Sequence, residues 1–144
     1  MKKAKTSAKN IVNRRARFDY ELGDELVAGM SLRGVEVRAV RDGRVSLKGA
    51  FVTLRNGRKG EELWLNNASF SLKNQGEGIS KADAIDTSPK KLLATRKQIE
   101  DFSSQKKAGF TIVPVKILAE GRFIKIVIAL GKGKKQYDKR ETLK

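Results

Sequence analysis

The sequence contains neither cysteine nor histidine. Because there is no cysteine, disulfides and thiolate metal sites are excluded, which fits a reducing cytosol. Because there is no histidine, the commonest general base and the commonest transition-metal ligand are missing, and a Ser-His-Asp or Cys-His catalytic site is impossible. Only carboxylates, lysines and hydroxyl groups remain for catalytic chemistry.

Long apolar runs are also absent. No stretch approaches the roughly 18 apolar residues that a membrane-spanning helix needs. The first ten residues, MKKAKTSAKN, are basic at the start but contain no apolar stretch of the kind found in a secretory signal. We therefore expect a cytoplasmic protein that has no membrane partner.

Acidic residues are few relative to basic ones. The 144 residues include 32 Lys and Arg against 16 Asp and Glu, so the formal net charge is +16. Such an excess destabilises a compact chain by self-repulsion unless a polyanion lies close to it. Since no membrane segment is present, the charge points to a nucleic acid.

The densest basic segment is Gly131 to Arg140, which reads GKGKKQYDKR. Cations at this density suit phosphate oxygens. Tyr137 is placed to stack on a base or sugar, and Gly131 and Gly133 allow the backbone to approach a ligand closely. The alternative interpretation is a solvated, frayed basic terminus.

The chain divides into three parts by composition. We expect residues 1–12 to form a disordered basic arm, residues 13–131 to form one domain with a single core, and residues 132–144 to form a basic C-terminal segment.

Alternation of apolar and polar residues predicts about five strands, at residues 15–22, 48–55, 62–68, 110–118 and 122–130. Gly23-Asp24 is expected to end the first strand. The loop from Asn56 to Gly60 is too long for a tight two-residue hairpin, and Pro114 requires an edge or a bulge. In the last strand Lys125 should face solvent and four residues the core: Ile124, Ile126, Ile128 and Leu130.

A short helix is predicted at about residues 35–42. Val37 and Val40 lie three residues apart on one face, and Gly43 fits a C-terminal cap. Arg38 and Arg41 lie near the C-terminus, where the helix dipole favours cations.

A long helix is predicted at about residues 88–108. Ser88 is suited to be its N-cap and Pro89 its first residue. Lys90 and Lys91 would then oppose the helix dipole, which indicates an external anion.

These elements predict a mainly β fold with flanking helices, of the α+β class. About five closely spaced strands around a single core favour an OB-like antiparallel β-barrel, which offers an open face to a nucleic acid. Periodicity alone leaves a half-open sandwich as the alternative.

Four segments of the chain resemble, in the same order, segments of the small protein B family, the bacterial partners of transfer-messenger RNA. They are NRRARFDY (13–20), GVEVRAVRDGR (34–44), KKLLATRKQI (90–99) and GKGKKQYDKR (131–140). The resemblance covers about residues 10–144, and Phe18 stands where the family usually has histidine.

The resemblance implies an OB-like barrel without cofactor or enzymatic activity. It implies binding to the tRNA-like domain of transfer-messenger RNA and delivery of that RNA to stalled ribosomes for trans-translation, with elongation factor Tu and alanyl-tRNA synthetase as indirect partners. The RNA-binding residues expected on this basis, and from charge, are Asn13, Arg14, Arg15, Arg17, Glu36, Arg38, Arg41, Lys90, Lys91, Thr95, Lys125, Lys132, Lys134, Lys135, Tyr137, Lys139 and Arg140.

Two other functions stay open. One is another ribosome-associated or ribosomal-RNA-binding module of the OB type. The other is a Mg²⁺-dependent nuclease that uses Glu77, Asp83 and Asp86, although these residues lie in a polar, glycine-bearing stretch with no general base beside them.

The C-terminal segment carries a further expectation. Members of the small protein B family normally continue past YDKR with a basic tail that becomes helical in the ribosome's messenger channel, whereas this sequence stops at Lys144. On this basis we expect RNA binding with little or no peptide tagging.

Overall fold

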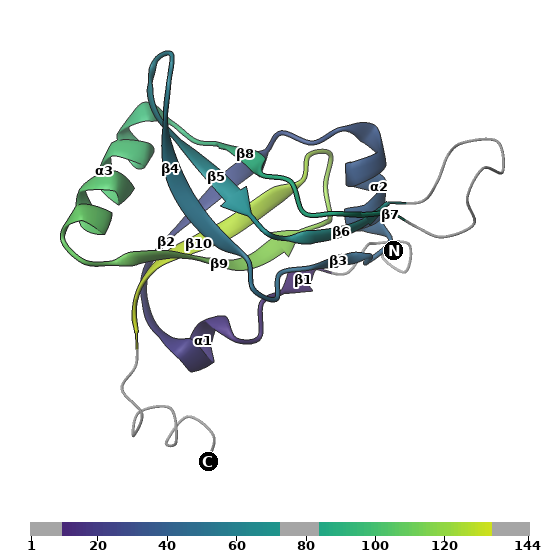
Figure 1. Ribbon diagram of the computed structural model, residues 1–144, viewed down its shortest axis with the longest axis horizontal. Coiled ribbons are helices and arrows are strands. Elements are labelled where there is room, and N and C mark those ends of the chain that lie inside the picture. The colour runs from purple at the N-terminus through teal and green to yellow at the C-terminus, as the bar shows by residue number, and fades with distance from the viewer. Residues whose placement is uncertain (1–9, 73–83, 134–144) are drawn as a thin grey trace, which may run out of the picture.

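The computed structural model describes residues 10–72 and 84–133, which fold into two antiparallel sheets and three helices (Figure 1). In chain order the elements are β1 (Ile11–Val12), α1 (Ala16–Asp19), β2 (Tyr20–Met30), α2 (Gly34–Arg41), β3 (Val45–Ser46), β4 (Phe51–Gly57), β5 (Gly60–Asn66), β6 (Ser69–Leu72), β7 (Ala84–Asp86), β8 (Lys90–Leu93), α3 (Arg96–Lys107), β9 (Thr111–Leu118) and β10 (Lys125–Gly133). The expectation of a mainly β fold with flanking helices is confirmed.

The larger sheet has seven strands in the order β1-β9-β10-β2-β8-β5-β4, and the smaller has β3-β6-β7. Within the described residues no strand pairing closes the larger sheet on itself. The edge strand β4 comes close to β9 without hydrogen bonding to it. The coarse α+β architecture therefore holds, whereas a closed barrel is not established.

The core takes side chains from both sheets and from helices α2 and α3. The four residues of the last strand region that were expected to face inward, Ile124, Ile126, Ile128 and Leu130, are all buried, and Lys125 is exposed. Each large side chain that leaves water in this way stabilises the fold by roughly 1.5–3 kcal/mol. The first strand, Ile11–Val12, already belongs to the sheet, ahead of the domain boundary expected from the sequence.

The prediction of a strand at residues 15–22 is wrong in its first half, where the chain forms the single helical turn α1. The side-chain oxygen of Asn13 accepts a hydrogen bond from the Arg15 backbone N–H, and Arg15 pairs with Asp19 one turn later. These local bonds favour a turn over an extended chain. Gly23-Asp24 does not end the following strand either, since β2 runs on to Met30, with a bulge in its pairing to β10.

The prediction of a helix beginning at Ser88 is also wrong. Residues Lys90–Leu93 form β8, a strand that pairs with β2 on one side and β5 on the other. The helix begins after Thr95, whose side chain accepts a hydrogen bond from the Gln98 backbone, while Gln98 in turn accepts one from the Thr95 backbone. This capping box is the stronger start signal, and β8 is needed to join the two halves of the sheet.

Three other expectations concern a hairpin loop, a bulge and the end of a helix. Gly57 pairs with Gly60 across the β4–β5 hairpin, so only Arg58 and Lys59 form its loop, and the expected longer loop is wrong. Of the edge or bulge expected at Pro114, the structure shows a bulge: the pairing of β9 with β10 shifts register between Val127 and Ile128, and Ile128 pairs with Pro114. Helix α2 ends as predicted, with Gly43 at a positive φ of 76° that glycine adopts easily.

Candidate nucleic-acid interface

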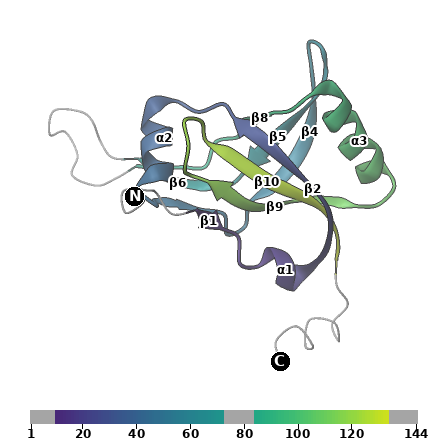
Figure 2. The ribbon, with the colours of Figure 1, turned by 180° about the vertical axis from the view of Figure 1, so that it is seen from behind.

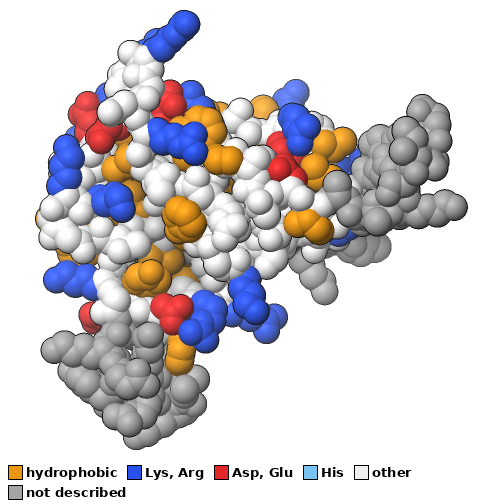
Figure 3. Space-filling view, viewed as in Figure 1, with side chains coloured by type: hydrophobic (Ala, Val, Ile, Leu, Met, Phe, Trp, Pro, Cys, Tyr) orange, Lys and Arg blue, Asp and Glu red, His pale blue; other side chains and the backbone are white. Residues whose placement is uncertain are grey.

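Basic side chains are distributed over several elements. On the face shown in Figure 3, lysine and arginine appear at the tip of the β4–β5 hairpin, over the body of the sheet and near α1. Charge alone therefore does not locate an interface, whereas exposed apolar side chains that border cations mark more specific candidate surfaces.

One such place is the outer face of the larger sheet. Lys125 of β10, Gly29 of β2 and Leu93 of β8 are direct neighbours across three strands. Leu93 is 50% exposed, and Val27, two residues before Gly29, is 51% exposed. Figure 2 shows β9, β10 and β2 from this side with no helix in front of them. This face therefore presents apolar side chains to solvent beside a lysine.

A small buried apolar cluster adjoins the same face. Val115, Val127 and Ala129 are buried and pack together, separately from the main core, with the partly buried Leu22 and Leu118 against them. We call the exposed side chains Val27, Leu93 and Lys125 the outer face. Apolar surface flanked by cations suits the sugars and unstacked bases of a structured RNA together with its phosphates.

Sequence reasoning missed Val27 and Leu93. Residues 26–32 alone do not separate a strand from a helical turn, and Leu93 falls within the helix predicted at about residues 88–108. The alternation of buried Leu26, Ala28 and Met30 with Val27 and Gly29 contains the signal, but it becomes readable only once the strand is known.

Lys90, expected to contact RNA, is buried in an ion-pair network instead. Its Nζ donates to Glu36 Oε2 at 2.6 Å, to Asp86 Oδ2 at 2.5 Å and to Ser88 Oγ at 2.9 Å. Its side chain is only 4% exposed and lies against the ring of Phe70. In this position Lys90 ties β8 to α2 and β7, and it is not available to a phosphate.

Glu36, also expected at the RNA surface, is buried with it. Burial by itself raises the pKa of Glu36, but hydrogen bonds from Lys90 and from the backbone and side chain of Arg33 lower it by more, so the net pKa is lowered. Burial also raises the pKa of Asp86, but hydrogen bonds from Lys90 and Ser88 lower it by more. The net pKa of Asp86 therefore lies well below its usual range. The two carboxylates are therefore held ionised around one ammonium group.

Helix α2 presents two of the predicted arginines. Arg38 is exposed. Arg41 Nη2 donates to the carbonyl oxygens of Gly121 at 2.8 Å and Arg122 at 3.2 Å, which joins the helix to the turn between β9 and β10. Arg38 is thus the freer of the two for a phosphate contact.

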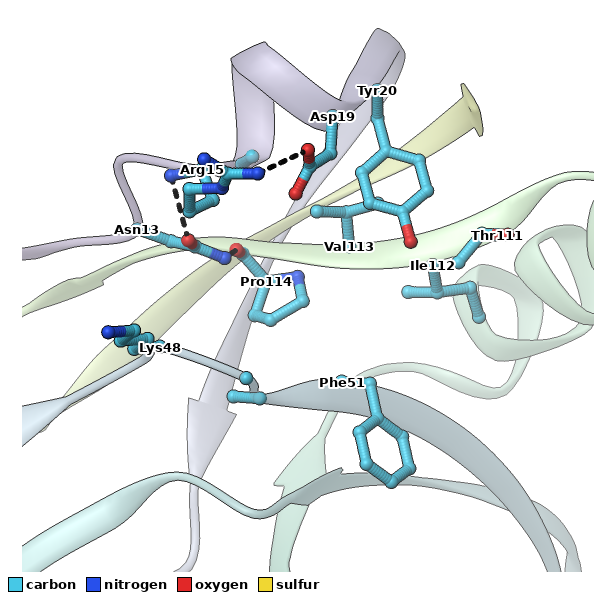
Figure 4. A pocket seen from close by; sticks show the side chains of 13 residues that line it. Asn13, Arg15, Asp19, Tyr20, Lys48, Phe51, Thr111, Ile112, Val113 and Pro114 are labelled. Carbon is cyan, nitrogen blue, oxygen red and sulfur yellow. Dashed lines mark hydrogen bonds and ion pairs between the residues drawn. The ribbon is translucent and has the colours of Figure 1, made fainter. Parts of the chain in front are cut away.

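The N-terminal motif, residues 13–20, runs beside β9 and ends at Tyr20, which pairs with Gly133 of β10; Figure 4 shows several of its side chains. Asn13 Nδ2 donates to the Pro114 carbonyl at 2.7 Å, so Asn13 fastens the chain to β9. The Arg15 guanidinium lies 4.5 Å from the centre of the Phe18 ring and pairs with Asp19 at 3.1 Å. Two further predicted arginines on this segment, Arg14 and Arg17, are exposed.

A hollow of about 710 Å³ opens beside this motif, where β4 comes close to β9. Lys48 and Arg15 line it together with the rings of Tyr20 and Phe51, which lie on opposite sides of the opening in Figure 4. Cations and aromatic faces of this kind suit a phosphate with its neighbouring base.

The remaining residues that were expected to bind RNA differ in their contacts. Lys91 pairs with Glu62 at 3.2 Å, Thr95 caps α3, and Lys132 lies 5.1 Å from the centre of the Phe110 ring. Gly131 is packed against its own sheet, where an added Cβ would lie 3.1 Å from Tyr20 Cβ, so its small size serves packing and not a ligand. Five predicted residues lie outside the described part of the chain: Lys134, Lys135, Tyr137, Lys139 and Arg140.

The acidic residues considered for Mg²⁺ do not form a described site. Glu77 and Asp83 lie outside the described residues, and Asp86 is paired with Lys90. Residues 10–72 and 84–133 contain no cluster of three acidic side chains able to hold a metal ion. No helix within these same ranges is long and apolar enough to span a membrane.

Comparison with known proteins assigns the family. The family model described as SmpB protein matches residues 10–144. SsrA-binding proteins of Enterococcus faecalis and Halalkalibacterium halodurans are 43% and 41% identical over 133 residues, which is 92% of this chain and 82% of each relative. A solved structure described as "tmRNA-SmpB: a journey to the center of the bacterial ribosome" is 31% identical with a TM-score of 0.68, over 95% of this chain and 96% of that one. The chain belongs to the SmpB family.

Proposed function

We propose that this protein binds the tRNA-like domain of transfer-messenger RNA, which is SsrA, and helps to deliver it to stalled ribosomes for trans-translation. The observation that carries the proposal is the outer face, where the exposed Val27 and Leu93 border Lys125. Relatives of the chain that are described as SsrA-binding proteins support the choice of RNA. A compact RNA fold offers such a face its backbone and its unstacked loop bases.

A second surface supports the ribosomal part of the proposal. Tyr20, the last residue of the N-terminal motif, pairs with Gly133 at one end of β10, whereas Lys125 begins that strand. Eight residue steps at about 3.3 Å separate the two ends by about 25 Å. A protein that bridges an RNA and a ribosome needs two separate contact surfaces, and Arg14, Arg15 and Arg17 supply the second.

The protein acts in this proposal by binding alone, in the cytoplasm. Its larger sheet works as an OB-like half-open barrel in which β4 and β9 come close without pairing. Elongation factor Tu and alanyl-tRNA synthetase act on the RNA itself, so they are indirect partners.

A competition binding assay tests the proposal. Labelled transfer-messenger RNA is titrated with the protein at fixed salt, with a ribosomal RNA fragment of equal length as competitor. We expect the fragment to compete at least tenfold less well than unlabelled transfer-messenger RNA. Equal competition would favour the alternative, a general ribosomal-RNA-binding module.

A further inference from the structure

A second basic hollow, of about 430 Å³, lies between the tip of the β4–β5 hairpin and the junction of β8 with α3. Arg58 and Lys59 reach it from the hairpin loop, Lys91 from β8, and Arg96 from the first turn of α3. Glu62 is the only carboxylate among its lining residues, so four cations face one anion.

The Arg96 side chain is held in place by the hairpin. Its Nη1 donates to the Glu61 carbonyl at 2.8 Å. Gly60, at φ +125°, lets the guanidinium approach closely, because a Cβ there would lie 3.0 Å from Nη1. Among the described residues no other hydrogen bond to this guanidinium is found, so its remaining N–H groups are oriented and free to bind a ligand.

The charges of the hollow are only partly balanced. Lys91 pairs with Glu62 at 3.2 Å, and the neighbouring Glu61 carboxylate accepts a hydrogen bond from Ser103. Arg58 and Lys59 form no ion pair with any described residue. Arg58, Lys59 and Arg96 therefore converge on a hollow whose one described carboxylate, Glu62, already pairs with Lys91. The excess positive charge is self-repelling unless an external anion joins it.

The hollow is continuous with the outer face. Leu93 lines it and is also the cross-strand neighbour of Gly29, which pairs in turn with Lys125. Two strand spacings, about 10 Å, separate Leu93 from Lys125. An RNA that covers the outer face therefore reaches this hollow without a second molecule being required.

We propose that Arg58, Lys59 and Arg96 bind phosphate groups of the same RNA that occupies the outer face, and so form an additional contact for the RNA backbone. The inference rests on the proposed function. The three side chains contact the phosphate backbone of the RNA and not its bases, because the described lining of the hollow contributes cations and no aromatic ring.

The test replaces Arg58 and Lys59 together with Gln and measures binding to transfer-messenger RNA over a range of salt concentrations. Each lost phosphate contact makes the slope of log K against log salt shallower by about 0.7–0.9. We expect a slope shallower by about 1.4–1.8 and an affinity at least tenfold lower at 0.1 M salt. Lys106→Gln with Lys107→Gln is the matched control, since it removes two exposed cations from the other end of α3.

The outcomes separate this inference from the proposed function. Equal losses in the hairpin variant and the control variant would overturn the inference, because bulk charge would then explain both. An unchanged slope in the hairpin variant would overturn it as well. If the unaltered chain failed to bind transfer-messenger RNA, the proposed function would fall first, and the inference with it.

Discussion

At the residue scale, the side chain that sequence reasoning placed most wrongly is the most informative. Lys90 was assigned to RNA because a lysine at a helix N-terminus opposes the dipole, yet it lies in a strand and holds two carboxylates. Nothing local in the sequence brings Glu36 to Lys90, since 54 residues separate them. Buried pairs of this kind become visible only when the fold is known.

Replacing Lys90 with Met should destabilise the protein strongly. The change leaves Glu36 and Asp86 without their shared ammonium group, and breaking a buried ion pair by removing one partner costs about 3–5 kcal/mol. Urea unfolding measures the loss. Lys91→Met is the matched control, because its pair with Glu62 is more exposed and its removal should cost far less. Equal losses would show that the Lys90 network contributes little.

The same network sets the response of stability to acid. The folded-state pKa of both Glu36 and Asp86 is lowered, so their contribution is fully present above the unfolded values of about 4 and is lost as the pH falls below them. We expect the free energy of unfolding to be flat from pH 7 to 5 and to decline below about pH 4. Glu36→Gln should decline less steeply than the unaltered chain, and Glu100→Gln, on the exposed side of α3, should decline as steeply. A Glu36→Gln curve parallel to that of the unaltered chain would contradict the assignment.

At the scale of elements, long regular patterns were predictable and short competing signals were not. The alternation of β10 and the capped α2 were read correctly because each combines a strong period with a clear end. Residues 88–99 contain two helix starts, at Ser88 and Thr95, and only the pairing of β8 with β2 and β5 selects the second. The tight hairpin was missed because Gly57 and Gly60 pair across a loop of two basic residues.

Gly131 and Gly133 give an element-scale prediction, although both were expected to serve a ligand. A side chain at Gly131 would meet Tyr20, Val113 and Leu22 at 3.1–3.3 Å, whereas nothing lies within 4 Å of a Cβ at Gly133. Gly131→Val should therefore cost about 1–3 kcal/mol by overpacking, and Gly133→Val should be close to neutral in thermal unfolding. Equal tolerance of both changes would show that β10 shifts to accommodate them.

At the scale of the whole molecule, composition predicted the class of partner and the motifs predicted the family, but neither predicted the working surface. Strand alternation shows which residues share a face and leaves open which face a helix covers. The sequence alone therefore does not distinguish Val27 and Leu93 from core residues. The structure shows both side chains exposed, on a face of the sheet that no described helix covers. The approach of β4 to β9 without pairing could not be predicted from the sequence either, because the two strands are far apart along the chain.

The net charge leads to a prediction for the complete interface. With basic residues on the outer face, on α2 and on the N-terminal motif, roughly five to eight phosphate contacts give a slope of log K against log salt between about −4 and −7. Titrations of transfer-messenger RNA at several potassium chloride concentrations measure it. A slope shallower than about −2 would mean that most of the cations are solvated and do not touch the RNA.

The central claim is that the outer face of the sheet carries the RNA. The most direct test changes Leu93 and Lys125 together to Gln and measures both the affinity for transfer-messenger RNA and the free energy of unfolding. Because both side chains are exposed, we expect stability to change by no more than about 1 kcal/mol, while the affinity falls at least tenfold. Unchanged affinity in a stably folded variant would contradict the account.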